Sequence, residues 1–155
     1  VIATMKTDID TRIANTKTYI DKIDNWGICD SVASSYKIKK TEFSEWWNYI
    51  LTLTNDQREF YVRFATVMMM FHFIKEDYID QVLQELLHIT HDGYYVQMAV
   101  AWAISVCFIK FRDKTLNVIM SKELCKFTQN KSIQKIRESR RVSAEDKILL
   151  LEYKK

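Results

Sequence analysis

The chain has 155 residues, of which 48% are hydrophobic and 13% aromatic, with no proline and only two glycines. Tight β-hairpin turns need residues with positive φ or proline at their corners, so this composition excludes a β-rich fold and favours long helices. The net charge is only +3, but residues 126–155 carry nine Lys or Arg against four Asp or Glu. Such a segment fits phosphate contacts, although charge alone is explained more simply by the solvated face of a terminal helix.

Caps and apolar periodicity predict helices along the whole chain. Isoleucines 9, 13, 20 and 23 form an apolar stripe on a first helix or pair of helices. Candidate N-caps at Asn25, at Thr41, at Thr54 or Asn55, and at Ser143 are expected to open later helices. The expected ranges are 26–36, 41–54, 57–74, 78–89, 94–111, 113–127, 129–140 and 143–153.

Helices joined by such short links pair as antiparallel hairpins, and no single hairpin can bury both of its faces. We therefore expect an all-α protein in which residues 1–155 form one domain of stacked helical hairpins, an α-solenoid. An ordinary globular helical bundle is the structural alternative. In the range 57–74, Phe60, Phe64, Val67 and Phe71 are expected to share one face.

The cysteine pattern and the hydropathy bound the class of protein. Cys29, Cys107 and Cys125 are far apart and fit neither a disulfide framework nor a zinc knuckle, which indicates reduced thiols in a cytoplasmic protein. There is no signal peptide, and the most apolar stretch, residues 98–109, has the length of a buried core helix rather than a membrane span. We expect no membrane association.

Generic catalytic motifs are missing: the chain has no P-loop, no G-x-G-x-x-G, no G-x-S-x-G and no H-E-x-x-H. His88 and His91 are three residues apart, but the pair crosses a predicted helix end and lacks a convincing third ligand, so no metal site is expected. His72 lies in an apolar segment and is interpreted as a core histidine.

Trp26 and Asp30 are four residues apart, which places them on one face of a helix, one turn from each other. A carboxylate beside an indole can stabilise a cation, because the ring excludes water and its own face attracts positive charge. The alternative is an aspartate near a helix start beside a core tryptophan, and this pair alone favours that alternative.

Two further residues are unusual for their surroundings. Arg63 falls within an apolar run, where a charge needs a partner or a phosphate. Trp102 lies between small alanines that permit a close approach of another backbone or a ligand. The simpler interpretations are that Arg63 extends to the surface and that Trp102 fills core volume.

At these residues the chain resembles the AlkD-type DNA alkylation repair family, the HEAT-like-repeat DNA glycosylases. The matching segments are IDNWGICDS at 23–31, FYVRFATVMMMFHFI at 60–74, DGYYVQMAVAWAISVCFIKF at 92–111 and NKSIQKIRESRRVSAEDK at 130–147. They occur in family order and cover nearly the whole chain. The family has further helical repeats before its Trp/Asp motif, so we expect this chain to be the C-terminal portion of a longer HEAT-like architecture.

The resemblance implies a monomeric DNA glycosylase that binds duplex DNA in a concave, basic groove. Its substrates would be cationic N-alkylated purines such as 3-methyladenine and 7-methylguanine, and it would need no metal and no organic cofactor. Asp30 would be the catalytic carboxylate, Trp26 an aromatic wall against the sugar or lesion, Trp102 a second aromatic of the cleft and Arg63 a phosphate contact. Further phosphate contacts would come from Lys131, Lys135, Arg137, Arg140 and Arg141.

The chain departs from the family pattern at two positions. Phe64 stands where active members tend to have a second arginine, and Ser105 follows Trp102 where another basic residue is expected. Besides the glycosylase, two hypotheses therefore stay open: a non-catalytic HEAT-like module that binds DNA, and a protein scaffold without DNA affinity.

Overall fold

The computed structural model describes residues 2–155, and these form α-helices and short 3-10 turns with no strand among them. The elements are η1 Ile2–Thr4, α1 Ile9–Ile20, α2 Trp26–Ser35, η2 Lys40–Glu42, α3 Phe43–Leu51, α4 Glu59–His72, α5 Ile79–His88, α6 Tyr94–Lys110, α7 Arg112–Ser121, α8 Lys126–Glu138, α9 Ala144–Leu149 and η3 Leu150–Tyr153. The all-α prediction is confirmed.

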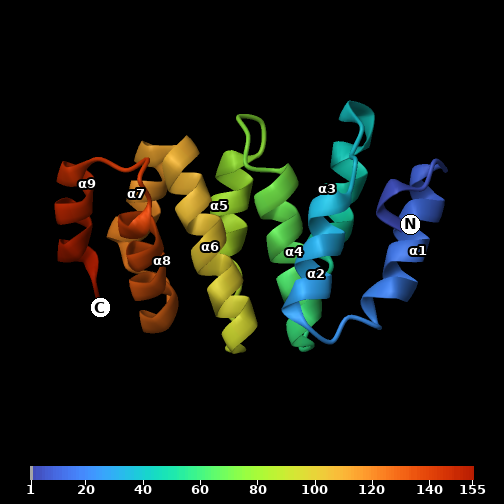
Figure 1. The fold of residues 1–155 in the computed structure, drawn as a ribbon, viewed down its shortest axis with the longest axis horizontal. Helices are drawn as coiled ribbons and strands as arrows, with labels where there is room; N and C mark the ends of the chain where they lie inside the picture. Colours follow the sequence, from blue (N-terminus) through green and yellow to red (C-terminus); the bar gives the residue numbers. More distant parts are fainter. Residues whose placement is uncertain (1) are drawn as a thin grey trace.

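The helices form two layers of a stack that runs from the N-terminal to the C-terminal end (Figure 1). One layer, here called the even layer, consists of α2, α4, α6 and α8, which contact one another in that order. The other, the odd layer, contains α1, α3, α5 and α7, and α3·α4 and α5·α6 pack as antiparallel hairpins. Helices of the even layer all run in the same direction, so their N-terminal ends lie along one edge of the stack (Figure 1). The arrangement is an α-solenoid, as expected.

Helix starts follow local hydrogen bonding where the sequence provides a capping side chain. Asn25 accepts from the backbone N–H of Ile28 at the start of α2, and Ser143 accepts from that of Asp146 at the start of α9. Each bond satisfies a donor that the first helical turn leaves unpaired. Asn25 and Ser143 are thus confirmed as N-caps.

Two expected caps are wrong. Thr41 lies inside η2, and the chain enters α3 through Glu42, which is buried against Arg12 of α1. At α4 the first turn begins at Glu59, where Asp56 accepts from the backbone N–H of Arg58, rather than at Thr54 or Asn55. In both places a charged pair overrides the simpler Ser/Thr/Asn pattern, because an arginine lies within reach of the carboxylate.

Helix α6 lies between α4 and α8 within its layer and against α5 and α7 behind it. Contact on so many sides explains why its sequence is apolar all round rather than along one stripe. Small residues at Ala99, Ala101 and Ala103 are buried and let the neighbouring helices approach closely. Helix α8 begins at Lys126, three residues earlier than predicted, because the polar residues of its first turn carry no apolar periodicity.

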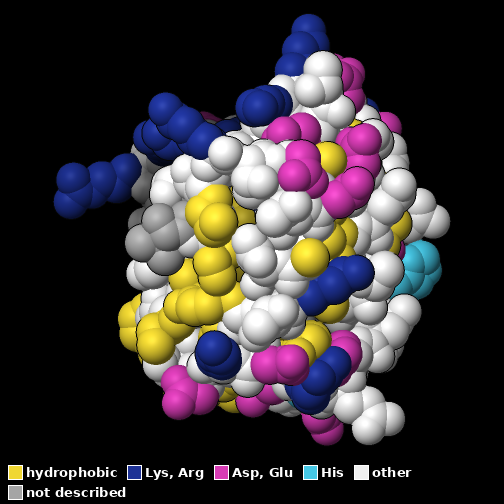
Figure 2. Space-filling model, turned by 90° about the vertical axis from the view of Figure 1, so that its right-hand side faces the viewer, with side chains coloured by type: hydrophobic (Ala, Val, Ile, Leu, Met, Phe, Trp, Pro, Cys, Tyr) yellow, Lys and Arg dark blue, Asp and Glu magenta, His cyan; other side chains and the backbone are white. Residues whose placement is uncertain are grey.

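The N-terminal end of the stack is partly apolar. Figure 2 shows hydrophobic side chains gathered on this end, with charged side chains around them. A hollow of about 250 Å³ lies here, between Tyr19 of α1 and Val32 of α2. Among the described residues, none of the helices combines the length and hydropathy needed to cross a membrane.

Candidate functional site

Asp30 of α2 and Arg63 of α4 form a bidentate ion pair between adjacent helices of the even layer. Arg63 Nε donates to Asp30 Oδ1 at 2.9 Å, and Nη2 donates to Oδ2 at 2.7 Å. The third donor, Nη1, reaches the backbone carbonyl of Tyr95 in α6 at 2.6 Å. One arginine therefore ties together three successive helices, and both planar groups are held in a single orientation.

The pair lies just below the surface. The Asp30 side chain is 14% exposed and the Arg63 side chain 7% exposed, so the carboxylate keeps limited access to solvent. This differs from the phosphate contact expected for Arg63, since its guanidinium donates three hydrogen bonds within the protein. Breaking a pair this poorly hydrated is costly, because the remaining partner would be left as an uncompensated charge.

Local packing fixes α6 against this pair. Glu59 Oε1 accepts from the backbone N–H of Tyr95, in the first turn of α6, at 2.8 Å. A Cβ atom on Gly93 would lie 2.6 Å from the same Glu59 oxygen, so only glycine permits this approach without a shift. Gly93 therefore allows α6 to begin where its Tyr95 carbonyl can meet Arg63.

Cys29, next to Asp30 in the sequence, is fully buried. Burial, helped by the nearby Asp30 carboxylate and opposed by Arg63, raises the pKa of its thiol to about 12. A thiol with that pKa is protonated at neutral pH and is a poor nucleophile. Cys29 is therefore not a candidate nucleophile at this site.

Trp26, the first residue of α2, lies one helical turn before Asp30 and is 54% exposed. Exposing so large a ring to water is unfavourable unless the surface is used, so Trp26 is a candidate contact for a ligand. Trp26, Asp30 and Arg63 thus occupy one region of the even layer, as the sequence suggested.

Trp102 lies further along the same layer. It is partly buried, and its ring meets that of Phe71 edge to face, with centroids 5.8 Å apart. Phe71 is eight residues beyond Arg63 in α4, which corresponds to about 12 Å along a helix axis. Trp102 and Phe71 thus form an aromatic pair near the end of α4, and a role for Trp102 in the same cleft as Asp30 stays a prediction.

Phe71 is more exposed than the residues with which it was grouped. It was expected to share one face of the helix with Phe60, Phe64 and Val67, and it is 41% exposed while Phe64 and Val67 are fully buried. Its position next to the last helical residue, His72, is the signal that was missed, because a helix end leaves one side without a neighbour.

Comparison with protein-family models shows to which family the chain belongs. Residues 1–138 match the model described as DNA alkylation repair enzyme. The chain belongs to this family. No curated protein and no solved structure shows significant similarity to it.

Membership in the DNA alkylation repair enzyme family makes DNA the substrate and alkylation repair the role of the protein. The matched region ends at residue 138, the last residue of α8, so α9 and η3 lie beyond it. Every element that carries Trp26, Asp30, Arg63 and Trp102 lies within the matched region.

The two departures from the family pattern have different structural meanings. Phe64 is fully buried in the core, so the side chain at position 64 does not face DNA whatever its type. Ser105 is also buried, and its hydroxyl donates to the carbonyl of Trp102 at 2.6 Å. Neither position therefore offers a surface on which a basic residue of this repair protein could act.

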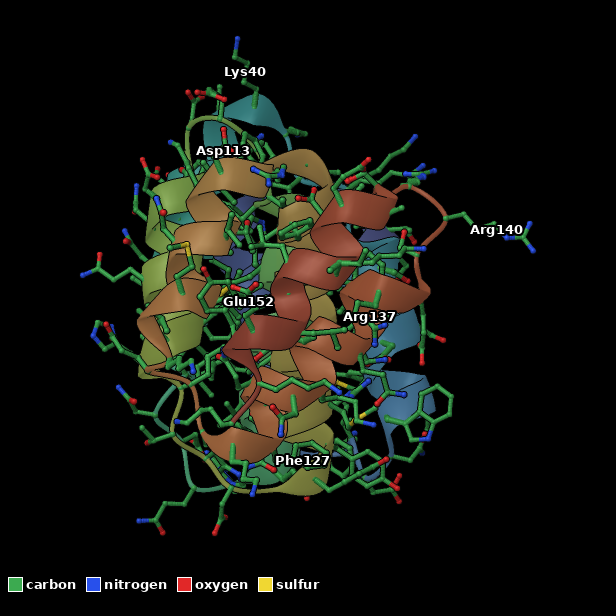
Figure 3. The ribbon with its side chains drawn as sticks, turned by 90° about the vertical axis from the view of Figure 1, so that its left-hand side faces the viewer. Lys40, Asp113, Phe127, Arg137, Arg140 and Glu152 are labelled. Carbon is green, nitrogen blue, oxygen red and sulfur yellow. The ribbon has the colours of Figure 1, made fainter. Side chains whose placement is uncertain are left out.

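The predicted phosphate contacts lie apart from Asp30, on α8 and after it. Lys131 and Arg137 line a groove of about 660 Å³, and Arg137 Nε donates to the carbonyl of Lys147. Arg140 follows α8 in an exposed loop and points away from the body of the molecule (Figure 3). Arg141 is likewise exposed, and Lys135 is half-buried. Because α6 lies between α4 and α8, none of these cations adjoins the Asp30–Arg63 pair.

His91, one of the two candidate metal ligands, and His72, interpreted as a core histidine, both have partners within the protein. His91 Nε2 lies 2.9 Å from the carbonyl of Gln57, and its Nδ1 accepts from the backbone N–H of Gly93. His72 Nε2 contacts the carbonyl of Ala33 at 2.7 Å and links α4 to α2. Within residues 2–155 no group of three or more His, Cys, Asp or Glu side chains could hold a metal ion.

Proposed function

We propose that the protein is a DNA glycosylase that excises cationic N-alkylated purines, 3-methyladenine and 7-methylguanine, from duplex DNA. The observation that carries this proposal is the bidentate Asp30–Arg63 pair beside the exposed ring of Trp26. One copy of the chain suffices, because all three side chains come from the same two helices.

The bond that the protein would break is already weak in the substrate. In a purine alkylated at a ring nitrogen, the bond from C1′ to N9 is already weakened by the positive charge of the base. When this bond breaks, its electron pair cancels that charge, and positive charge develops at C1′ of the sugar. A water oxygen then adds to C1′ and its proton leaves to solvent, giving the free base and an abasic sugar.

Asp30 would oppose the charge at C1′ through the part of its carboxylate that remains exposed. A fixed negative group facing a developing cation lowers the barrier because it needs no reorganisation when the charge appears. Arg63 is a positioning residue, since its two hydrogen bonds hold the carboxylate plane. Trp26 would pack against the sugar or lesion and exclude water from that side.

The test is release of 7-methylguanine and 3-methyladenine from methylated duplex DNA by wild type and Asp30→Asn in parallel. We expect the substitution to reduce release at least about 100-fold, in line with the loss of a preorganised electrostatic group. Duplex affinity should stay nearly unchanged. Equal loss of binding and release would count against a catalytic carboxylate.

The chain offers a matched control in its other buried pair. Glu42 accepts from Arg12 at 2.8 Å and is similarly buried, at 10% exposure. Glu42→Gln should therefore lower the thermal midpoint about as much as Asp30→Asn, while release per folded molecule stays at the wild-type level.

A second candidate, a DNA-binding module without catalysis, is favoured by one observation. Both carboxylate oxygens of Asp30 already accept hydrogen bonds from Arg63, as in a purely structural pair. This alternative predicts no release by the wild-type protein but salt-sensitive binding to unmodified duplex, with a shallow dependence because few phosphates are contacted.

A further inference from the structure

Every helix of the even layer carries an aromatic residue in its first two positions: Trp26 in α2, Phe60 in α4, Tyr94 and Tyr95 in α6, and Phe127 in α8. Because these helices are parallel, their N-terminal ends, which carry these residues, lie along one edge of the stack (Figure 1). Four of the rings form a continuous series, the aromatic row: Phe60, Tyr95, Tyr94 and Phe127. Their successive centroids are 5.6, 5.4 and 6.0 Å apart.

Three of the four rings of the row are exposed, while Phe60 is partly buried against the core. Tyr94 is 57% exposed, and Tyr95 and Phe127 are each more than a third exposed. Hydrophobic packing does not explain this, since the chain has a large core in which such rings would be stabilised. The row begins beside the candidate site, because the carbonyl of Tyr95 accepts from Arg63.

At its other end the row enters a groove of about 660 Å³, the cationic groove. Its lining is Lys126, Phe127, Asn130, Lys131, Gln134, Arg137 and Lys154, with no carboxylate among these residues. Lys131 Nζ lies 5.9 Å from the ring centroid of Phe127, so the last ring of the row also belongs to the groove. Figure 3 shows Phe127 and Arg137 at different heights of α8.

A row of aromatic rings that leads into a groove lined by cations without carboxylates fits one class of ligand. Aromatic platforms beside a basic groove bind single-stranded nucleic acid, because bases stack on the rings while cations follow the backbone. A duplex cannot use the rings in this way, since its bases are already stacked and paired. An acidic peptide would be attracted to the cations but would leave the exposed rings without a role.

We propose that the aromatic row and the cationic groove together bind single-stranded DNA. The occupant is DNA because the chain belongs to a family that repairs DNA. This proposal is independent of the glycosylase activity: binding to a single strand at this edge requires neither Asp30 nor excision.

The experiment measures fluorescence anisotropy of a labelled oligothymidylate of about 20 nucleotides, a length that spans the site sizes known for such surfaces. A duplex of equal length and a strand of the same length without bases are the comparison probes. Phe127→Ala and Tyr94→Ala should each weaken binding of oligothymidylate about fivefold or more, because each removes a stacking surface. Duplex binding should change less than about twofold, and the base-free strand should bind more weakly than oligothymidylate.

The contribution of the cationic groove is tested with a separate variant and its own control. Lys131→Gln should reduce the slope of log affinity against log salt by about 0.7, the value for one phosphate of a single strand. Lys40→Gln removes an exposed lysine that lies far from Phe127 (Figure 3) and should leave the slope unchanged. Met120→Ala, an exposed apolar residue of α7, is the matched control for the ring substitutions.

Three results would overturn the proposal. The first is that the wild-type protein does not bind oligothymidylate at low salt, and the second is that it binds the strand without bases as tightly as oligothymidylate. The third is that Phe127→Ala weakens binding of single strand and duplex by the same factor. Circular dichroism and the thermal midpoint of each variant check that it is folded, which is expected because the substituted side chains are exposed.

Discussion

The two layers of the stack build their cores from the same kinds of residue but present different surfaces. Of the aromatic side chains in residues 2–155, five are exposed: Trp26, Phe71, Tyr94, Tyr95 and Phe127. All five belong to the even layer, whereas the aromatic residues of α1 and α3 are buried or partly buried, and α5 and α7 contain none. The aromatic residues of both proposed sites therefore lie on the even layer.

Within residues 2–155, each layer also contains one buried ion pair, and the two pairs can be compared. Arg12 of α1 pairs with Glu42 and also donates to the carbonyl of Lys37, and its guanidinium lies 5.6 Å from the centroid of the buried Trp46 ring. Arg63 likewise binds a carboxylate and a backbone carbonyl, but it holds Asp30 through two nitrogens, and Asp30 lies one helical turn from the exposed Trp26. The two pairs thus differ in their surroundings, and only the pair of the even layer lies beside an exposed aromatic ring.

The largest contrast is expected between two tryptophans. Trp46 in α3 is fully buried, and Trp46→Ala should destabilise the protein by about 3–5 kcal/mol through lost burial and the cavity that remains. Trp26→Ala should cost less than about 1 kcal/mol, because the ring is mostly hydrated in the folded state. Urea denaturation measures both. Trp26→Ala should instead lower the release of 7-methylguanine, and a variant with full release would show that the ring does not contact the substrate.

Substituting the two arginines by lysine separates positioning from stability. Arg63→Lys and Arg12→Lys keep the charge but lose the planar fork, so each should destabilise the protein by about 1–3 kcal/mol. Only Arg63→Lys should also slow excision, by about 10- to 100-fold, because the Asp30 carboxylate would no longer be held in one orientation. KM should change less than kcat. If Arg12→Lys slowed excision as much as Arg63→Lys, the effect would come from lost stability and not from the orientation of Asp30.

A smaller effect is expected at the start of α2. Asn25→Ala removes the bond to the Ile28 N–H and should cost about 1 kcal/mol. Because the first turn of α2 carries Trp26, excision should fall as well. Ser143→Ala, which removes the cap of α9, should cost about the same stability with no change in excision. Thermal midpoints and release assays on both variants decide this.

The smallest effect is a pH dependence at the contact between α4 and α2. Burial lowers the pKa of His72 below its ordinary value of 6.5, and nearby Lys75 lowers it further, while the hydrogen bond to Ala33 opposes the shift. The unfolded chain therefore takes up a proton more readily, so stability is lost as pH falls below about 6.5. His72→Gln keeps a donor for the Ala33 carbonyl and should flatten this loss between pH 7 and pH 5.5, a range chosen around the ordinary histidine value. At pH 8 the histidine is neutral in both the folded and the unfolded protein, so the variant should match wild type in urea denaturation. If the variant loses as much stability at low pH as wild type, groups other than His72 cause the loss.

Much of the helical layout could be predicted from the sequence. Asn25 and Ser143 open helices as expected, and the apolar segment from residue 94 forms α6 as one continuous helix. The prediction failed at Thr41, which lies inside η2, and at the start of α8. In those places the helix start depends on partners from elsewhere in the chain or lacks a periodic signal.

Trp26 and Asp30 share a helical face because they are four residues apart, and this relation is fixed by the helix itself. The sequence by itself determined such local features, since caps and spacings involve hydrogen bonds and side chains within one turn. Only the tertiary structure decided that Arg63 pairs with Asp30, that Phe71 is exposed and that α6 separates the α8 cations from the site. Those outcomes depend on how each helix is rotated and which neighbours it has, and such contacts join residues thirty or more positions apart in the chain.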